Sequence, residues 1–177
     1  MQYIKILAEL NQTDLPIAGG KGANLGALIL AGLPVPSGFC VTTPAYQAFV
    51  ELNKLEAEIF KILDATQMDD PASLDAASTA IRSCFQQGEM PPTLADEIRQ
   101  AYGNLHNPAS PVAVRSSATA EDLPDLSFAG QQDTYLNILG EAALLDAVIR
   151  CWASLWTARA IGYRARNHIP HNMVALA

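Results

Sequence analysis

Cysteine is scarce in this sequence, and its placement excludes two classes of site. The 177 residues contain three cysteines, Cys40, Cys84 and Cys151, which lie far apart and without the two-residue spacing of a metal-binding pair. An odd number at these separations argues against a disulfide framework and against a structural zinc site. We expect the three thiols to be small, buried, apolar side chains.

Long apolar runs are also missing. No stretch approaches the roughly 20 residues that a membrane-spanning helix needs, and residues 1–14 lack the uninterrupted apolar core of a secretory leader. We therefore expect no membrane partner and a cytoplasmic location.

Positive charge is in short supply as well. The 11 lysines and arginines are outnumbered by 18 aspartates and glutamates, which gives a formal net charge of −7. Such a surface repels nucleic acid, so we expect no nucleic-acid partner. A polyanionic ligand would have to be held by a local positive cluster. Lys21 and Arg115, which stand beside glycines or at a predicted strand end, are the candidates for it.

The apolar content is sufficient for one folded domain. Half of the residues are hydrophobic, and a chain of this length can bury one sizeable core. Apolar residues spaced by three to four positions predict helices over residues 43–63, 74–85, 91–105 and 141–159. Short apolar or alternating runs predict strands over residues 3–7, 39–41, 112–114 and 133–138. We expect residues 1–177 to form a single α/β (α+β) domain, with a short mixed sheet packed against several helices.

The stretch 112–137 carries the densest set of polar residues suited to a ligand. A short apolar run at its start predicts a buried strand that delivers Arg115 to its end. Small hydroxyl residues and an acidic, turn-forming loop separate this strand from the next. Arginine offers five fixed donors suited to phosphate, and hydroxyls and glycine amides can complete the oxygen shell. A structural strand with Arg115 paired to Asp122 or Asp125 fits the same residues, so both interpretations stay open.

A glycine-rich motif around one lysine, Gly19 to Gly22, is the second candidate. Its glycines permit close approach of the backbone, and the apolar spacing from Leu25 onwards predicts a helix that begins just after the motif. A helix N-terminus behind such a loop favours phosphate. The motif has neither the Walker pattern nor the third glycine of a dinucleotide fingerprint. Taken alone, it fits an ordinary connection into a helix as well as a ligand loop centred on Lys21.

The C-terminal part has residues with simpler explanations. Trp152 and Trp156 are four residues apart on a predicted helix, where they fit a core or docking face better than a platform for adenine. His168 and His171 have no cysteine or carboxylate nearby in the sequence, which argues against a metal site. The apolar run at residues 173–177 is expected to be a strand cut partway along, as in a fragment of a longer chain.

Three motifs carry a resemblance that covers essentially the whole chain. They are GGKGANLGAL from Gly19, GLPVPSGFCVTT from Gly32 and VRSSATAEDLPDLSFAGQQDTYLN from Val114. Their wording and order resemble the N-terminal part of the ATP-grasp nucleotide-binding domain shared by phosphoenolpyruvate synthases, pyruvate phosphate dikinases and rifampicin phosphotransferases. The versions SSATAEDLPD and SFAGQQDT are closer to the synthase and antibiotic branches than to the phosphate dikinase branch, and they do not separate these two.

The resemblance implies the ATP-binding part of a phosphoenolpyruvate synthase. In that family the positions that match Lys21 and Arg115 neutralise the phosphates of ATP, and those that match Gly130 and Thr134 line the nucleotide. The resemblance also implies Mg²⁺, pyruvate and a homodimeric full-length enzyme, with the metal ligands, the carrier histidine and the pyruvate-binding domain downstream of this chain. No catalytic residue and no metal ligand is expected within it. A rifampicin phosphotransferase domain and a non-catalytic nucleotide-binding module remain alternatives.

Overall fold

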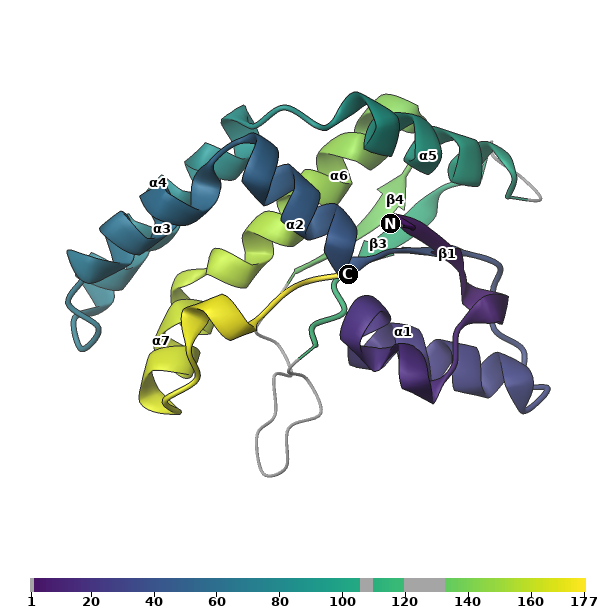
Figure 1. Ribbon diagram of the computed structural model, residues 1–177, viewed down its shortest axis with the longest axis horizontal. Helices are drawn as coiled ribbons and strands as arrows, with labels where there is room; N and C mark the ends of the chain where they lie inside the picture. The colour runs from purple at the N-terminus through teal and green to yellow at the C-terminus, as the bar shows by residue number, and fades with distance from the viewer. Residues whose placement is uncertain (1, 106–109, 120–132) are drawn as a thin grey trace.

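The computed structural model describes residues 2–105, 110–119 and 133–177 (Figure 1). Its strands form two antiparallel ladders, in which β1 (Ile4–Ile6) pairs with β2 (Phe39–Val41) and β3 (Val112–Arg115) pairs with β4 (Thr134–Ile138). The four predicted strands and the α+β class are confirmed. The single mixed sheet is wrong for the described residues, because an apolar cavity separates β2 from β3.

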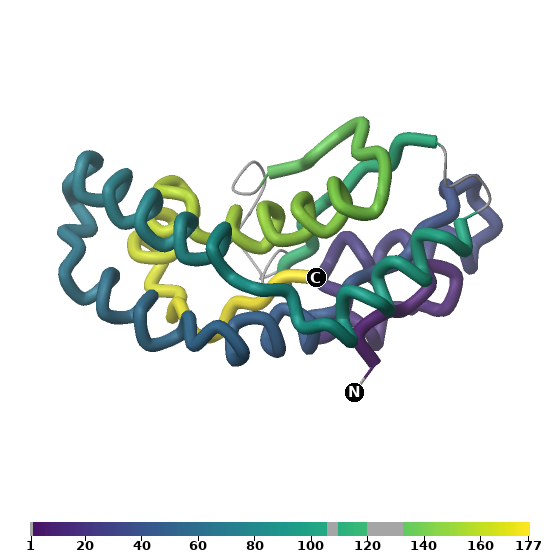
Figure 2. Tube along the Cα trace, turned by 90° about the horizontal axis from the view of Figure 1, so that it is seen from above, coloured from purple at the N-terminus to yellow at the C-terminus, as the bar shows by residue number. Residues whose placement is uncertain are grey.

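The described residues contain seven α-helices, and α3, α4 and α7 lie together to one side of the ladders (Figures 1 and 2). They are α1 (Leu15–Leu30), α2 (Thr43–Leu52), α3 (Leu55–Asp64), α4 (Pro71–Gln87), α5 (Pro92–Gly103), α6 (Glu141–Ala153) and α7 (Ala158–Arg166). α1 lies beside the β1–β2 ladder, whereas α4 packs against α3, α6 and α7 in a helical layer. The cavity lies between α1 and α6.

Prolines stand at the start of helices α2, α4 and α5, and a side-chain cap precedes one of them. Pro44, Pro71 and Pro92 stand in the first turn of α2, α4 and α5, where a backbone N–H group would have no helical partner. Before α4, the Asp70 carboxylate accepts hydrogen bonds from two backbone N–H groups of the first turn. Such a cap stabilises a helix by about 1 kcal/mol.

The helix predicted over residues 43–63 is broken into α2 and α3. The Asn53 side chain donates hydrogen bonds to the carbonyl groups of Phe49 and Glu89, at 2.8 and 3.0 Å. Lys54 then adopts a left-handed conformation with φ of 53° before α3 begins. The apolar spacing continues across this break, so the pattern alone predicts one helix.

The helix predicted over residues 141–159 ends early, at Ala153. The Ser154 hydroxyl donates to the Cys151 carbonyl at 2.6 Å, and a 3-10 turn follows before α7 starts. This change of direction brings Trp152 and Trp156 into the core, where they are 2% and 3% exposed. The core explanation of the two tryptophans is therefore confirmed.

One continuous core joins helices α2 to α7 to the end of the chain, and α1 belongs to a separate small cluster. At its centre, the ring centroid of Phe49 lies 5.8 Å from that of Phe85 and 5.3 Å from that of Trp152. Val174 and Leu176 also belong to this core and are buried. The last residues are thus a part of the fold and not a loose tail.

Cys40 and Cys151 are buried as predicted, Cys84 is partly exposed, and all three are free thiols. Among the described residues, no helix has the length and apolar content to cross a membrane.

Candidate functional site

The glycine motif lies inside a helix, and the loop predicted there is wrong. Gly19 alone interrupts α1, with φ of 67° and ψ of 175°, and helical turns stand on both sides of it. A Cβ atom on Gly19 would lie 2.3 Å from the carbonyl oxygen of Ser117. The kink therefore requires glycine. The motif packs against Ser117 and does not form the open loop that a glycine-rich pattern favours.

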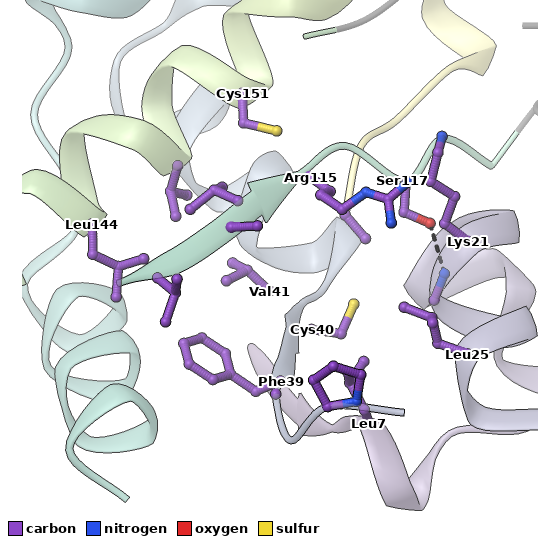
Figure 3. A pocket seen from close by; sticks show the side chains of 18 of the residues that line it. Leu7, Lys21, Leu25, Phe39, Cys40, Val41, Arg115, Ser117, Leu144 and Cys151 are labelled. Carbon is purple, nitrogen blue, oxygen red and sulfur yellow. Dashed lines mark hydrogen bonds between the residues drawn. The ribbon is translucent and has the colours of Figure 1, made fainter. Parts of the chain in front are cut away.

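The second half of α1 has its own N-terminus, which the protein itself caps. The N–H group of Gly20 donates to the Ala118 carbonyl at 3.1 Å, and that of Gly22 donates to Ser117 Oγ at 3.0 Å (Figure 3). Ser117 is thus a capping residue that stands 95 positions away in the sequence. These two backbone donors, which a phosphate-binding loop would direct at its ligand, are used within the fold.

The segment that supplies this cap is held from its other side by the end of the chain. Ser117 and Ala177 exchange two backbone hydrogen bonds, each 2.9 Å long. Beside them, Ala118 and Leu176 form an antiparallel bridge. The extended segment predicted at residues 173–177 is therefore present in its last three residues, and it fixes the position of Ser117.

Arg115 and Lys21 come together at one end of a cavity of about 450 Å³. Arg115 ends β3, Lys21 belongs to the kinked part of α1, and Ser117 lines the same end (Figure 3). Thr134 is the Cα partner of Arg115 on β4 and stands outside the cavity lining. The structure thus brings two of the four predicted site residues, Lys21 and Arg115, to one cavity from separate elements, and Thr134 neighbours Arg115 outside it.

Away from these cations the cavity wall is largely apolar and includes two thiols, Cys40 and Cys151. Burial raises the pKa of each thiol to about 12. At Cys151 the charge of Asp133 adds to this rise and the charge of Lys21 opposes it. Both thiols are therefore protonated at neutral pH, which excludes a thiolate nucleophile at these positions.

Other cations near the ladders are engaged by carboxylates. Lys5 Nζ lies 2.7 Å from Asp14, and this hydrogen bond is the main cause of a lowered pKa at the Asp14 carboxyl. Arg159 pairs with Asp133, which also lies 3.9 Å from Arg82. Among the described residues that line the cavity, Lys21 and Arg115 are the cations.

Arg164, near the end of α7, is a fully buried cation. Its Nη1 donates to the Leu155 carbonyl at 2.8 Å, and its Nε donates to His171 Nδ1 at 2.9 Å. Burial lowers the pKa of Arg164 to about 10. Burial and the Arg164 charge together lower the pKa of His171 to about 4. His171 is therefore a neutral hydrogen-bond acceptor in this contact.

A family of nucleotide-binding domains matches most of the chain. Residues 15–177 match the model described as the pyruvate phosphate dikinase AMP/ATP-binding domain. The chain belongs to this family. The resemblance drawn from the three sequence motifs is thereby confirmed.

Several phosphoenolpyruvate synthases are similar to this AMP/ATP-binding domain. The chain is 43% identical, over 99% of its length, to the probable phosphoenolpyruvate synthase of Pyrococcus abyssi and to the phosphoenolpyruvate synthase of Pyrococcus furiosus, and the match takes in 26% of each protein. It is 48% identical over its whole length to the probable phosphoenolpyruvate synthase of Methanocaldococcus jannaschii, of which the match takes in 15%. The chain thus spans about a quarter or less of the length of these relatives.

Three of the predicted residues of the AMP/ATP-binding domain lie outside the part of the chain that the structure describes. Gly130 lies outside the described residues, as do Asp122 and Asp125, so the alternative pairing of Arg115 with these carboxylates falls outside them too. The part of the chain that the structure describes holds no group of three histidine, cysteine or carboxylate side chains that could bind a metal ion. Sequence reasoning missed the capping role of Ser117, because no local pattern marks a cap that comes from so far along the chain.

Proposed function

We propose that this chain is the ATP-binding part of a phosphoenolpyruvate synthase, within an ATP-grasp architecture. One observation carries the proposal: Lys21 and Arg115, from elements far apart in the sequence, line one end of the same cavity beside the Ser117 hydroxyl. Membership of an AMP/ATP-binding family supports ATP as the ligand. The names of the similar proteins support the synthase rather than an antibiotic phosphotransferase.

In the proposed site, Arg115 presents a planar guanidinium to phosphate oxygens, and Lys21 adds a compact charge. These two cations hold the phosphates against the repulsion of a chain whose formal net charge is −7. Thr134, across the ladder from Arg115, and Gly130 line the nucleotide. Bound ATP supplies the phosphoryl group, and Lys21 and Arg115 stabilise the negative charge on it by position and electrostatics.

The complete enzyme that we propose converts ATP, pyruvate and water to phosphoenolpyruvate, AMP and phosphate through a phosphohistidine. The carrier histidine, the pyruvate-binding domain and the Mg²⁺ ligands belong to parts of that enzyme outside this chain, and we propose a homodimer. The described residues offer no cluster that fits Mg²⁺, so we assign none of them to the metal.

Replacement of Arg115 should weaken ATP binding. A hydrogen bond to a charged group contributes about 1.5–3 kcal/mol, so Arg115→Ala should raise the Kd for Mg-ATP by about tenfold to a hundredfold. Arg115→Lys should recover only part of this loss, because an ammonium group cannot make the bidentate contact. NMR titration of the chain with Mg-ATP measures the Kd and should show amide shifts at Lys21, Arg115 and Thr134.

Arg99→Ala is the matched control for that titration. Arg99 is an exposed cation on α5 that pairs with Asp96 and Glu141, and it does not line the cavity. Its loss changes the net charge as much as Arg115→Ala does, and it should leave the Kd nearly unchanged. An absence of shifts at Lys21 and Arg115, or equal effects of the two alanine variants, would contradict the proposed site.

A further inference from the structure

The cavity beside Arg115 runs along strand edges and not over strand faces. Side chains of a strand alternate between two faces, so a pocket on one face is lined by every second residue. Here every residue of the ranges 38–41 and 111–115 lines the cavity. The cavity therefore lies beside the main chains of β2 and β3, on the edges that β1 and β4 do not occupy.

These surroundings suit a buried β-strand. A strand edge presents a row of N–H and C=O groups that can pair with an added strand. Apolar side chains line the cavity on both sides, with Leu144 from α6 lying across it from Leu7 and Leu25 (Figure 3), and Val148 also lines it. An apolar segment in extended conformation would satisfy the edge groups with its backbone and fill the space with its side chains.

The end of the chain already forms the first hydrogen-bonded pairs of such a ladder. Ser117 and Ala177 exchange two backbone hydrogen bonds, and the Thr119 N–H group donates to the Ala175 carbonyl at 3.3 Å. This is the bonding pattern of an antiparallel pair. The segment that ends at Ala177 therefore runs antiparallel to the residues that follow β3, and Ala177 itself lines the cavity.

The register of these hydrogen-bonded pairs predicts which residues of β3 an extension beyond Ala177 would pair with. Hydrogen-bonded pairs in an antiparallel ladder recur every second residue. Starting from the Ser117–Ala177 pair, the second position beyond Ala177 stands opposite Arg115, and the fourth stands opposite Ala113. A regular extended backbone from Ala113 to Ser117 places the N–H and C=O groups of Arg115 and Ala113 on the same side as those of Ser117, which is the cavity side.

We propose that the cavity is a slot for one further β-strand, formed by polypeptide that continues from Ala177 in longer members of this family and paired antiparallel with β3. The matched region is 26% of the Pyrococcus furiosus protein, so those chains have ample further length. The added strand fills the apolar space between the two ladders and joins them into one sheet. It also holds the main chain of Arg115 from both sides.

Hydrogen exchange of single amides tests this proposal without any nucleotide. Three chains are compared: residues 1–177, the same chain extended by the eight or so residues that follow the matched region in the Pyrococcus furiosus phosphoenolpyruvate synthase, and a glycine-serine extension of equal length. The amides of Arg115 and Ala113 report on the slot. The Ser117 amide is the internal reference, because it already bonds to Ala177.

The native extension should slow exchange at Arg115 and Ala113 by about tenfold or more, and the glycine-serine extension should not. Replacing the apolar residues of the native extension by aspartate should return both amides to their rates in residues 1–177, since charged side chains cannot enter the slot. Equal exchange at Arg115 and Ala113 in all of these chains would overturn the proposal. This outcome is separate from that of the ATP titration, because no ligand is present.

Discussion

Arg164 is a cation in the core, and among the described residues its side-chain hydrogen-bond partner is a histidine. The contact requires a neutral imidazole, because a protonated His171 would set two positive donors face to face. Trp156 helps to hold the guanidinium, whose Cζ atom lies 5.0 Å from the ring centroid. The stability of this corner of the core therefore depends on the protonation of one side chain.

Acid should weaken the fold through His171. The pKa of His171 is about 4 in the folded protein and near 6.5 in an unfolded chain. Between these values the unfolded state binds a proton that the folded state does not, so the free energy of unfolding falls as the pH drops from 6.5 towards 4. His171→Asn keeps an acceptor atom near Nδ1 without titrating. Its urea midpoint should therefore depend less on pH in this window than that of the wild type.

The same replacement at His168 is the control for this effect. His168 is exposed and has a left-handed conformation with φ of 54°, which asparagine tolerates. His168→Asn should keep the wild-type slope of the urea midpoint against pH. Identical slopes for the two asparagine variants would show that His171 does not cause the acid sensitivity.

The kink of α1 determines how this helix meets the segment that follows β3. Gly19→Ala places a methyl group against the Ser117 carbonyl and forces alanine into a backbone region that is almost exclusive to glycine. We expect a loss of about 2–4 kcal/mol in the free energy of unfolding, measured by urea denaturation. The cap on Gly22 should weaken with it, visible as faster exchange of the Gly22 amide.

Gly103→Ala shows what an alanine costs without such a contact. A Cβ atom at Gly103, the last residue of α5, meets no other atom within 4 Å. This variant should be neutral or more stable by up to about 1 kcal/mol. If Gly19→Ala matched it in stability, the kink would not need glycine.

The elements were predictable where their signals are local, and they were not where the deciding contact is distant. Proline at the start of α2, α4 and α5 and the apolar run of β3 are visible within a few residues. The break at Asn53 depends on Glu89, and the helical form of the glycine motif depends on Ser117. Such contacts join elements that the sequence separates, so no pattern within either element reveals them.

In the candidate site, too, the residue types were predictable from local patterns and their proximity in space was not. Arg115 and Lys21 were predicted because arginine at a strand end and lysine among glycines have a known use with phosphate. That both residues line the same cavity follows only from the packing of α1 against the residues after β3. Their role as ligands, like that of Thr134 and Gly130, stays a prediction that the ATP titration tests.

At the scale of the whole chain, Leu176 joins the helical core to the segment that follows β3. Leu176 is fully buried in the core that joins the helices, and it also pairs with the segment that caps α1. Leu176→Ala should lower the free energy of unfolding by about 2–5 kcal/mol, since it removes a buried side chain and leaves a cavity. Thermal unfolding and chemical denaturation measure the loss.

Met173→Ala serves as the comparison for that variant. Met173 is 71% exposed only three residues away, so its replacement should change the free energy of unfolding by less than about 0.5 kcal/mol. Equal effects of the two alanine variants would mean that the end of the chain is not a part of the cooperative fold.

The hydrogen bond from Gly22 to Ser117 spans 95 residues, and this span affects how the chain folds during its synthesis. Translation proceeds at about 5–20 residues per second, so on the order of 5–20 s separate the synthesis of the two partners. During that interval the second half of α1 lacks its Ser117 cap, and Ala177, which bonds to Ser117, is made later still. The second half of α1 is therefore completed only after the segment that follows β3 has been made.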